Sequence, residues 1–353
     1  MRILIIQYQM LGDVLVSSIL LEPLKKHFPK AQIDYLIDSP ALQVMQGNPF
    51  VDNYIIPKTT FKKSTLAVLK LAYKLKSHEY DVIIDVYGKL RSNIITAFSS
   101  APIKISWKKS ILSTKTSYIV ERISEPQHGQ SLAIENRLRL LEPLGIKAID
   151  EIENISPRIY LEETEISEAR ELLVDGGIKM DRPVLMISIL GSSSRKSYPL
   201  DYMATLLEAL VDWNPNYQLL FNYLPGQKEE AFTLYNLLST KTQENIFFDI
   251  YAQNLRSFLA ITSLCQAVIG NEGGAINMGK ALNIKSFVIF APYLKKRNWF
   301  GINELGHTAV HLADFIPFNE QDYDAANENF KEYYRKFTPE MILPTLKKFQ
   351  SEF

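Results

Sequence analysis

The chain has 353 residues, of which 46% are hydrophobic and 22% charged, so it can bury sizeable cores and is not a disordered protein. Its length suits two domains better than one. A single cysteine, Cys265, excludes an internal disulfide and a zinc site built from cysteines, and Asp, Glu or Lys interrupts every candidate membrane span.

The first half alternates short apolar runs with segments of helical periodicity. Apolar, β-branched runs predict strands buried on both faces, at 2–7, 33–37, 54–56, 82–86 and 103–107. Apolar residues at helical spacing predict helices between several of them, at 13–28, 66–77 and 132–144. This alternation indicates a largely parallel sheet with helices on both faces.

A change of composition around residues 150–182 indicates the connection to a second domain. Residues 150–153 are acidic, 159–161 could form a crossing strand, and 164–174 a helix. The strand–helix alternation then starts again, with strands expected at 184–190, 218–223, 246–250, 267–269 and 287–290. The tail, 327–348, is expected to be helical. The chain is therefore predicted to contain two doubly wound α/β units in tandem.

The loop after the first strand carries a candidate catalytic carboxylate. Ligands of open parallel sheets bind outside the carboxyl ends of strands, so loops that follow strands matter most. Gly12 would permit an unusual backbone turn, and Asp13 opens the predicted helix. Asp13 is either a helix N-cap or a carboxylate held at the site as a general base, and one residue can do both.

Two later loops contain residues suited to phosphate binding. Residues 191–196 combine a glycine with three serines and two cations, without the spacing of a P-loop. Residues 270–275 place glycines and Glu272 between a strand and a helix, where backbone N–H groups can approach a pyrophosphate. The alternatives are a polar surface loop for the first segment and a tight turn for the second.

Other patterns favour no additional chemistry. The five histidines lack metal-ligand spacing, and Asp322-Tyr323-Asp324 formally matches a metal-binding motif of sugar transferases but lies in a polar tail, where a solvated turn is expected. Cys265 is expected to be a small core residue on a helix face. We therefore expect no obligatory metal.

Four segments, in order along the chain, resemble the ADP-heptose:lipopolysaccharide heptosyltransferases of glycosyltransferase family nine. They are Arg2-Ile3-Leu4-Ile5-Ile6 with Leu11-Gly12-Asp13-Val14-Leu15, residues 80–88 with Arg91-Ser92, Lys196-Ser197-Tyr198-Pro199, and residues 270–282. The resemblance implies a GT-B architecture, with two Rossmann-like doubly wound domains facing a central cleft. An acceptor-binding domain (1–160), a sugar-nucleotide-binding domain (161–325) and a helical tail (326–353) are expected.

The resemblance also implies roles for individual residues. Asp13 would be the base that deprotonates the acceptor hydroxyl, and Lys196 would hold the donor phosphate. The acceptor would contact Gly12 and Arg91. The sugar nucleotide, ADP-linked in this family, would contact Ser192, Ser193, Ser194, Glu229, Glu272, Gly273, Gly274 and Asn277. The expected reaction is an inverting, metal-independent transfer of a heptose or related sugar, with no cofactor besides the sugar-nucleotide co-substrate.

Departures from the family pattern cluster at the donor residues. Glu272 replaces an aspartate, Gly273 a serine or threonine, Asn277 a histidine and Tyr198 a tryptophan. They leave open a different sugar nucleotide, an inactive or binding-only relative, or a sugar-nucleotide epimerase, which would need more acid/base groups than Asp13.

Charge is distributed unevenly along the chain. Residues 1–150 contain 20 Lys+Arg and 13 Asp+Glu, a net +7, and the remainder 19 and 26, a net −7. The basic half either suits an anionic partner, such as a phosphorylated lipopolysaccharide core, or reflects chance scatter over solvated surfaces. We expect no nucleic-acid partner, a monomer, and a cytoplasmic protein that works at the inner membrane surface.

Overall fold

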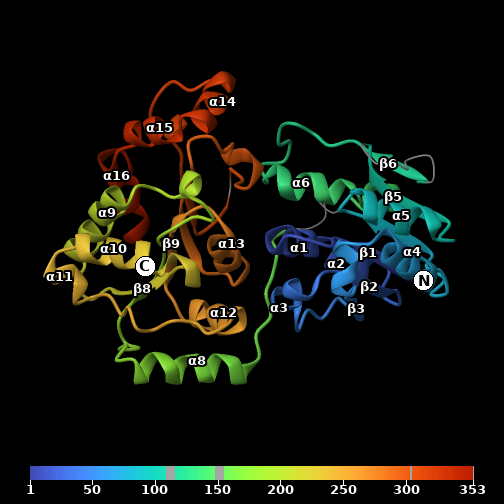
Figure 1. Ribbon diagram of the computed structural model, residues 1–353, viewed down its shortest axis with the longest axis horizontal. Helices are drawn as coiled ribbons and strands as arrows, with labels where there is room; N and C mark the ends of the chain where they lie inside the picture. The colour runs from blue at the N-terminus through green and yellow to red at the C-terminus, as the bar shows by residue number, and fades with distance from the viewer. Residues whose placement is uncertain (109–115, 148–154, 303, 353) are drawn as a thin grey trace. The chain divides into compact units, whose positions relative to one another are not determined.

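The computed structural model describes residues 1–108, 116–147, 155–302 and 304–352, which form two compact units. The first unit comprises Met1–Tyr160 with Arg297–Asn303, and the second comprises Leu161–Lys296 with Glu304–Phe353. The acidic stretch 150–153 lies outside the described residues. Each unit contains one parallel sheet with its own helices (Figure 1).

The first unit contains a six-stranded parallel sheet of order β3-β2-β1-β4-β5-β6. Its strands are β1 (Arg2–Ile6), β2 (Gln32–Leu36), β3 (Asn53–Ile55), β4 (Val82–Asp85), β5 (Ile103–Trp107) and β6 (Tyr118–Val120). The first five confirm the predicted strands. The sixth was not predicted because it is only three residues long and two of these are exposed, so it carries no buried apolar run.

The helices of the first unit include one that differs from its prediction. Those described are α1 (Leu11–Ser17), α2 (Leu21–His27), α3 (Leu42–Met45), α4 (Thr65–Lys76), α5 (Leu90–Phe98) and α6 (Leu132–Arg139), with 3₁₀ turns η1 (Ser18–Leu20), η2 (Ser39–Ala41), η3 (Thr59–Lys62) and η5 (Glu142–Leu144). The predicted continuous helix 13–28 is wrong, because η1 interrupts it. The Ser17 and Ser18 hydroxyls donate to the carbonyls of Asp13 and Leu15, a back-bonding that bends helices, and Pro23 lacks an N–H.

The second unit contains a five-stranded parallel sheet of order β11-β10-β9-β7-β8. Its strands are β7 (Val184–Ser188), β8 (Gln218–Asn222), β9 (Ala267–Asn271), β10 (Lys285–Ile289) and β11 (His307–Val310). Four were predicted, and β11 was not. The strands expected at 246–250 and 159–161 are wrong. In the first, only Ile246 bridges Leu219 before the Ile250 N–H turns back to the Phe247 carbonyl, and residues 159–161 join no sheet.

Helices cover the second sheet, and the last three helices of the chain complete the core of this unit. The described helices are α8 (Glu163–Asp175), α9 (Leu200–Trp213), α10 (Lys228–Leu237), α11 (Thr240–Gln243), α12 (Leu255–Ser263), α13 (Gly274–Ala281), α14 (Glu320–Glu328), α15 (Phe330–Lys336) and α16 (Pro339–Gln350), with 3₁₀ turns η6 (Ser194–Lys196), η7 (Pro225–Gln227), η8 (Lys296–Asn298) and η9 (Leu312–Asp314). Figure 1 shows α8 beside α12, and α14, α15 and α16 as the red end of the chain. Leu346 and Phe349 of α16 are buried in the core with Phe287 of β10.

Strand order indicates where each sheet binds a ligand. In open α/β sheets the binding crevice lies at the carboxyl ends of the two strands between which the order reverses. The orders place this switch point between β1 and β4 in the first unit and between β7 and β9 in the second. The loops that follow these four strands are therefore the candidate site loops.

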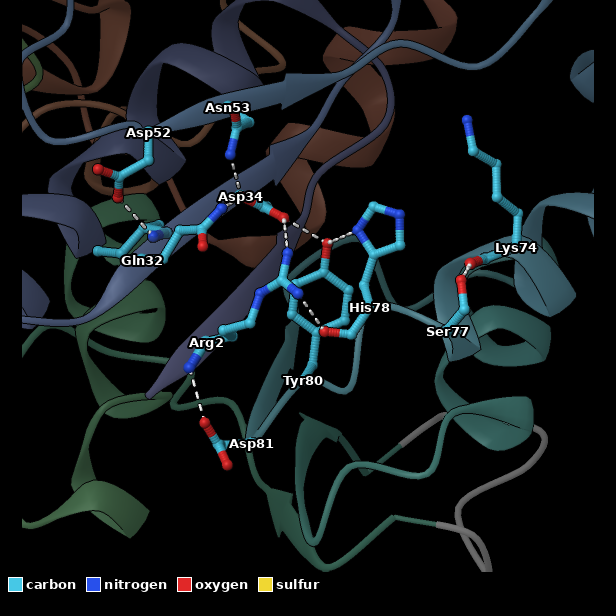
Figure 2. Close-up of polar contacts among 11 residues, drawn as sticks. Arg2, Gln32, Asp34, Asp52, Asn53, Lys74, Ser77, His78, Tyr80 and Asp81 are labelled. Atoms are coloured by element: carbon cyan, nitrogen blue, oxygen red, sulfur yellow. Dashed lines mark hydrogen bonds and ion pairs between the residues drawn. The ribbon is translucent and has the colours of Figure 1, made fainter.

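The opposite, amino-terminal edge of the first sheet is closed by a polar network around Asp34 (Figure 2). The buried Asp34 carboxylate accepts hydrogen bonds from Asn53 Nδ2 (2.9 Å), Gln32 Nε2 (3.3 Å) and the Tyr80 hydroxyl (2.5 Å), and Arg2 Nη2 lies 3.9 Å away. The Arg2 guanidinium also donates to the His78 carbonyl at 2.7 Å. Both oxygens of Asp34 are thus occupied, as a buried carboxylate requires.

Candidate active site

The first candidate site residue, Asp13, lies in the first turn of α1, directly after β1. Its Oδ1 accepts a hydrogen bond of 2.7 Å from Arg137 Nη2 of α6, and no other hydrogen bond reaches its carboxylate from the described residues. The Asp13 side chain is 35% exposed and that of Arg137 only 11%. Asp13 therefore keeps one oxygen open to a ligand and is oriented through the other.

Arg137 is held so that it can orient Asp13. Its Nε donates to Ser17 Oγ (2.9 Å) and its Nη1 to the Ala133 carbonyl (2.9 Å), so three separate acceptors fix the guanidinium plane. Burial lowers the pKa of Arg137, the Asp13 carboxylate opposes that shift, and a guanidinium remains protonated at neutral pH. A second cation, Arg122, stacks 4.3 Å from the Trp107 ring centroid and interacts electrostatically with Asp13 and Arg137.

The predicted capping role of Asp13 and the predicted turn at Gly12 are both wrong. The helix begins at Leu11, its N-cap is Met10, and no side chain caps it, so Asp13 lies inside the first turn. The unusual backbone conformation falls on Met10, with φ of 68°, and not on Gly12. A Cβ at Gly12 would meet no atom within 4 Å, so this position borders open space beside Asp13.

The loop after β4 adds cations and aromatic rings to this edge of the sheet. The Tyr87 hydroxyl donates to Gln9 Oε1 at 3.2 Å, which links this loop to the one after β1. Lys89 Nζ lies 4.7 Å from the Tyr87 ring centroid. Arg91, a predicted acceptor contact, is exposed in the first turn of α5 and donates to the Lys62 carbonyl at 2.5 Å. The exposed charges here are mostly positive, which suits an anionic ligand.

In the second unit, the loop 191–197 after β7 brings Lys196 to Glu272. Lys196 Nζ lies 3.4 Å from Glu272 Oε2, and the two side chains are 31% and 8% exposed. Ser192, Ser193 and Ser194 are exposed, and their hydroxyls make no hydrogen bond within the described parts of the chain. The geometry thus combines a cation, a nearly buried carboxylate and three available hydroxyls at the second unit's switch point.

The loop is closed by contacts that sequence reasoning missed. Ser197 Oγ accepts from the Gly191 N–H (3.0 Å) and donates to the Ser193 carbonyl (2.9 Å), and Gln227 Nε2 donates to the Gly191 carbonyl (2.8 Å). A Cβ on Gly191 would lie 2.4 Å from the Lys196 carbonyl oxygen, so only glycine allows the two ends to meet. Ser197 and Gln227 carried no signal beyond being polar residues near predicted loops.

Asn271, the last residue of β9, forms hydrogen bonds with backbone groups on both sides of the 191–197 loop. Its side chain is buried, donates to the carbonyls of Ser188 (3.1 Å) and Ile189 (2.9 Å), and accepts from the Tyr198 N–H (2.6 Å). At the preceding position, Gly270 has φ of 135°, and a Cβ there would meet the Ser188 carbonyl oxygen at 2.2 Å. The loop positions therefore depend on a buried amide that lies next to the predicted Glu272.

Of the remaining predicted donor residues, those of α13 lie at this site, whereas Glu229 lies on the surface. Gly273 is the N-cap of α13 without a side-chain cap, and Gly274 begins the helix, so N–H groups at this terminus can face an anion. Asn277 is half-buried in the second turn of α13. Glu229 is exposed in the first turn of α10, and no contact within the described residues joins it to Lys196 or Glu272.

Other sequence candidates have structural roles. Asp322 and Asp324 lie within α14 and not in a turn; Asp322 accepts from the Asn319 N–H and closes a capping box. Cys265 is buried in the turn after α12, and burial raises its pKa to about 12, so the thiolate is not formed at neutral pH. Within the described residues, no three His, Cys, Asp or Glu side chains form a possible metal-binding group. No described helix has the length and apolar composition needed to cross a membrane.

Comparison with known proteins decides the family. The model of glycosyltransferase family 9 (heptosyltransferase) matches residues 68–304, which include the loop after β4, the 191–197 loop and α13. The chain belongs to glycosyltransferase family 9. It is therefore a glycosyltransferase, as the resemblance implied. Asp13 lies before the matched region.

Relatives and solved structures of this family extend over nearly the whole chain. Lipopolysaccharide heptosyltransferase 1 of Campylobacter coli is 22% identical over 92% of this chain and 94% of the relative. A family 9 glycosyl transferase from Veillonella parvula superposes with a TM-score of 0.83 at 18% identity, covering 100% of this chain and 98% of that one. ADP-heptose lps heptosyltransferase II of E. coli gives 0.73 at 18% identity, covering 100% of both chains. The predicted GT-B fold is confirmed.

Proposed function

We propose that this family 9 glycosyltransferase moves a heptose, or a closely related sugar, from a nucleoside diphosphate to a lipopolysaccharide core or similar anionic glycan. The observation that carries the proposal is the match to family 9 through the loops at the second unit's switch point. Several relatives are lipopolysaccharide heptosyltransferases by name, including heptosyltransferase 3 of Escherichia coli, 29% identical over 38% of this chain.

The donor is proposed to bind at the 191–197 loop and the start of α13. Lys196 would contact the diphosphate, together with the serine hydroxyls and the N–H groups of α13. As the bond between the sugar's anomeric carbon and the phosphate oxygen breaks, negative charge grows on the leaving diphosphate. A lysine already held beside Glu272 stabilises this charge with little reorganisation.

The acceptor is proposed to bind at the first unit's switch point, beside Asp13. The open oxygen of Asp13 would take the proton from the acceptor hydroxyl as that oxygen forms its bond to the anomeric carbon, with inversion. The cations Lys89 and Arg91, in a half of the chain with net charge +7, suit phosphate groups on the acceptor. No step in this scheme requires a metal.

An ADP-linked sugar is the proposed donor, although four residues at the donor loops, Glu272, Gly273, Asn277 and Tyr198, differ from the family pattern. Glu272 keeps the carboxylate of the usual aspartate and pairs with Lys196 at 3.4 Å. Asn277 keeps a hydrogen-bonding side chain without a titratable ring. Glu272 and Asn277 thus keep polar groups at the site, whereas Gly273 lacks the hydroxyl of the usual serine or threonine. We expect the diphosphate contacts of Lys196 and of the α13 N–H groups to be retained.

The donor half is tested by calorimetric titration of the full chain with ADP, UDP, GDP and CDP in EDTA. ADP is expected to bind selectively, and Lys196→Ala to weaken ADP binding by roughly 10- to 100-fold, since a charge-assisted contact is lost. Lys241→Ala is the matched control, because Lys241 pairs with Asp212 on the surface at 2.6 Å and is expected to leave ADP binding unchanged.

The outcomes separate the parts of the proposal. Selective ADP binding, followed by transfer from an ADP-heptose to a lipopolysaccharide core oligosaccharide detected by mass spectrometry, supports it. Selective binding of another nucleotide overturns the adenine donor. Absence of binding to all four overturns the proposed nucleoside diphosphate donor and its site at the 191–197 loop.

A further inference from the structure

Helix α15 is hydrogen-bonded to the 191–197 loop through a buried tyrosine, Tyr334, although the two segments are far apart in sequence. The Tyr334 hydroxyl donates to the carbonyl oxygen of Arg195 at 3.1 Å, and Tyr334 is only 3% exposed. Arg195 is the residue directly before Lys196 and lies in the same 3₁₀ turn, η6. A contact at the Arg195 carbonyl therefore sets the orientation of the peptide that leads into Lys196.

The side chain of Arg195 makes a second link to the same part of the chain. Its Nη1 donates to Asn327 Oδ1 of α14 at 3.2 Å, and its guanidinium lies 5.8 Å from the ring centroid of Phe330 at the start of α15. Just beyond the loop, the buried Tyr198 hydroxyl donates to the Phe337 carbonyl at 2.7 Å. The loop and the last helices are therefore joined at both the beginning and the end of the Arg195–Tyr198 stretch.

On this side, Tyr198 packs against Tyr334 and Phe337 at ring-centroid distances of 6.1 and 5.7 Å, whereas the residues before it border a cavity. A cavity of about 710 Å³ lies here, and its lining includes Ser193, Ser194, Phe330, Lys331 and Tyr334. Packing therefore holds the Tyr198 end of the stretch, whereas η6 is linked to the last helices through the contacts of Arg195. Among the hydrogen bonds that join Arg195 and Tyr198 to the last helices within the described residues, the one made by Tyr334 is the one that reaches the peptide leading into Lys196.

We propose that Tyr334 is a positioning residue for the donor diphosphate, acting through the Arg195 carbonyl to hold Lys196 in its binding orientation. The inference rests on the proposed role of Lys196 in diphosphate binding. Without the hydrogen bond, η6 samples further orientations, and the apparent affinity falls in proportion to the fraction of molecules with Lys196 in place. The last helices, which lie outside the family match, then contribute to donor affinity.

The test is a double-mutant cycle in ADP affinity, measured by titration calorimetry on the full chain. Tyr334→Phe keeps the ring and removes the hydroxyl, and we expect ADP binding to weaken about fivefold, as for the loss of one hydrogen bond. In a Lys196→Ala background the same substitution is expected to have no further effect, because two residues that act through one contact are not additive.

Tyr217→Phe is the matched control. The buried Tyr217 hydroxyl donates to Gln350 Oε1 at 2.7 Å and also connects the sheet to the last helices, but next to the start of β8, away from the loop. Tyr217→Phe is expected to lose as much thermal stability as Tyr334→Phe and to bind ADP as the wild type does. This result separates positioning of Lys196 from general destabilisation.

Two results would overturn the inference: wild-type ADP affinity in Tyr334→Phe, or a fivefold loss that is the same with and without Lys196. A failure of the proposed function looks different, because Lys196→Ala alone would then bind ADP as tightly as the wild type. That outcome removes the inference together with the role assigned to Lys196.

Discussion

Asp34 and Asp13 lie at opposite ends of the first unit's sheet, and both are paired with arginines. Their surroundings differ in whether the carboxylate is free to exchange a proton with a ligand. Asp34 is buried, and four neighbouring groups surround its two oxygens. Asp13 is 35% exposed, and Arg137 contacts only its Oδ1. A carboxylate whose oxygens are all used stabilises the fold, whereas one held firmly through a single oxygen can exchange a proton with a ligand.

Asp85 gives an intermediate case at the carboxyl end of β4. It is fully buried, its Oδ1 accepts from the Gly88 N–H at 2.8 Å, and its Oδ2 has no hydrogen-bond partner among the residues that the structure describes. Burial raises the pKa of Asp85 to about 7, and the hydrogen bonds from Gly88 and its neighbours only partly oppose this shift. Position at the carboxyl edge is therefore not sufficient for acid–base chemistry, since Asp85 has no exposure to a ligand.

The largest expected effect is on catalysis, from Asp13→Asn. The amide keeps the size and the contact with Arg137 but cannot accept the acceptor's proton, so kcat should fall by about 10³-fold. Sugar transfer is measured by release of the nucleoside diphosphate, with ADP affinity as the control for an intact donor site. A variant that retains more than a tenth of the wild-type kcat would remove Asp13 from the role of base.

The second effect is on stability, from Asp34→Ala. Removing this carboxylate leaves the Tyr80 hydroxyl and the Asn53 amide without their buried acceptor, which should cost about 2 kcal/mol in the free energy of unfolding. Urea denaturation measures it. Asp34→Asn should lose less, because an amide oxygen still accepts a hydrogen bond. Equal losses in the two variants would contradict this account of the network.

The third effect is on the pH dependence of stability. The part of this dependence that comes from Asp85 should be absent in Asp85→Asn. Because the pKa of Asp85 is raised above its unfolded value, the folded chain holds a proton that the unfolded chain releases, and stability from this group is lost as pH rises from about 4 to about 7. Between pH 5 and pH 7, the free energy of unfolding of Asp85→Asn should therefore rise by about 2 kcal/mol relative to that of the wild type. Urea denaturation at the two values tests this, and a difference independent of pH would show that Asp85 is ionised throughout.

Much of the fold could be read from local pattern. Short apolar runs such as those of β1 and β7 are recognisable because a strand buried on both faces needs apolar residues throughout. The failures were segments where local pattern and tertiary environment disagree. Residues 246–250 are apolar except for Asp249 yet pair with β8 at one bridge, and β11 is paired although three of its four residues are only half-buried.

The candidate site was predictable in part. Asp13, Lys196 and Glu272 could be proposed because each follows a predicted strand, and strand order determines where ligands bind in such sheets. Their partners could not. Arg137 lies 124 residues from Asp13, and Tyr334 lies 139 residues from Arg195.

The sequence by itself therefore determined the two α/β units, the strands that bear the candidate loops and the family. Only the tertiary structure decided that both oxygens of Asp34 are hydrogen-bonded, that Asp85 is buried with a raised pKa, and that one oxygen of Asp13 is left open. The reason is physical: strand and helix formation depend on neighbouring residues, whereas hydrogen-bond saturation and burial depend on groups brought together from distant parts of the chain.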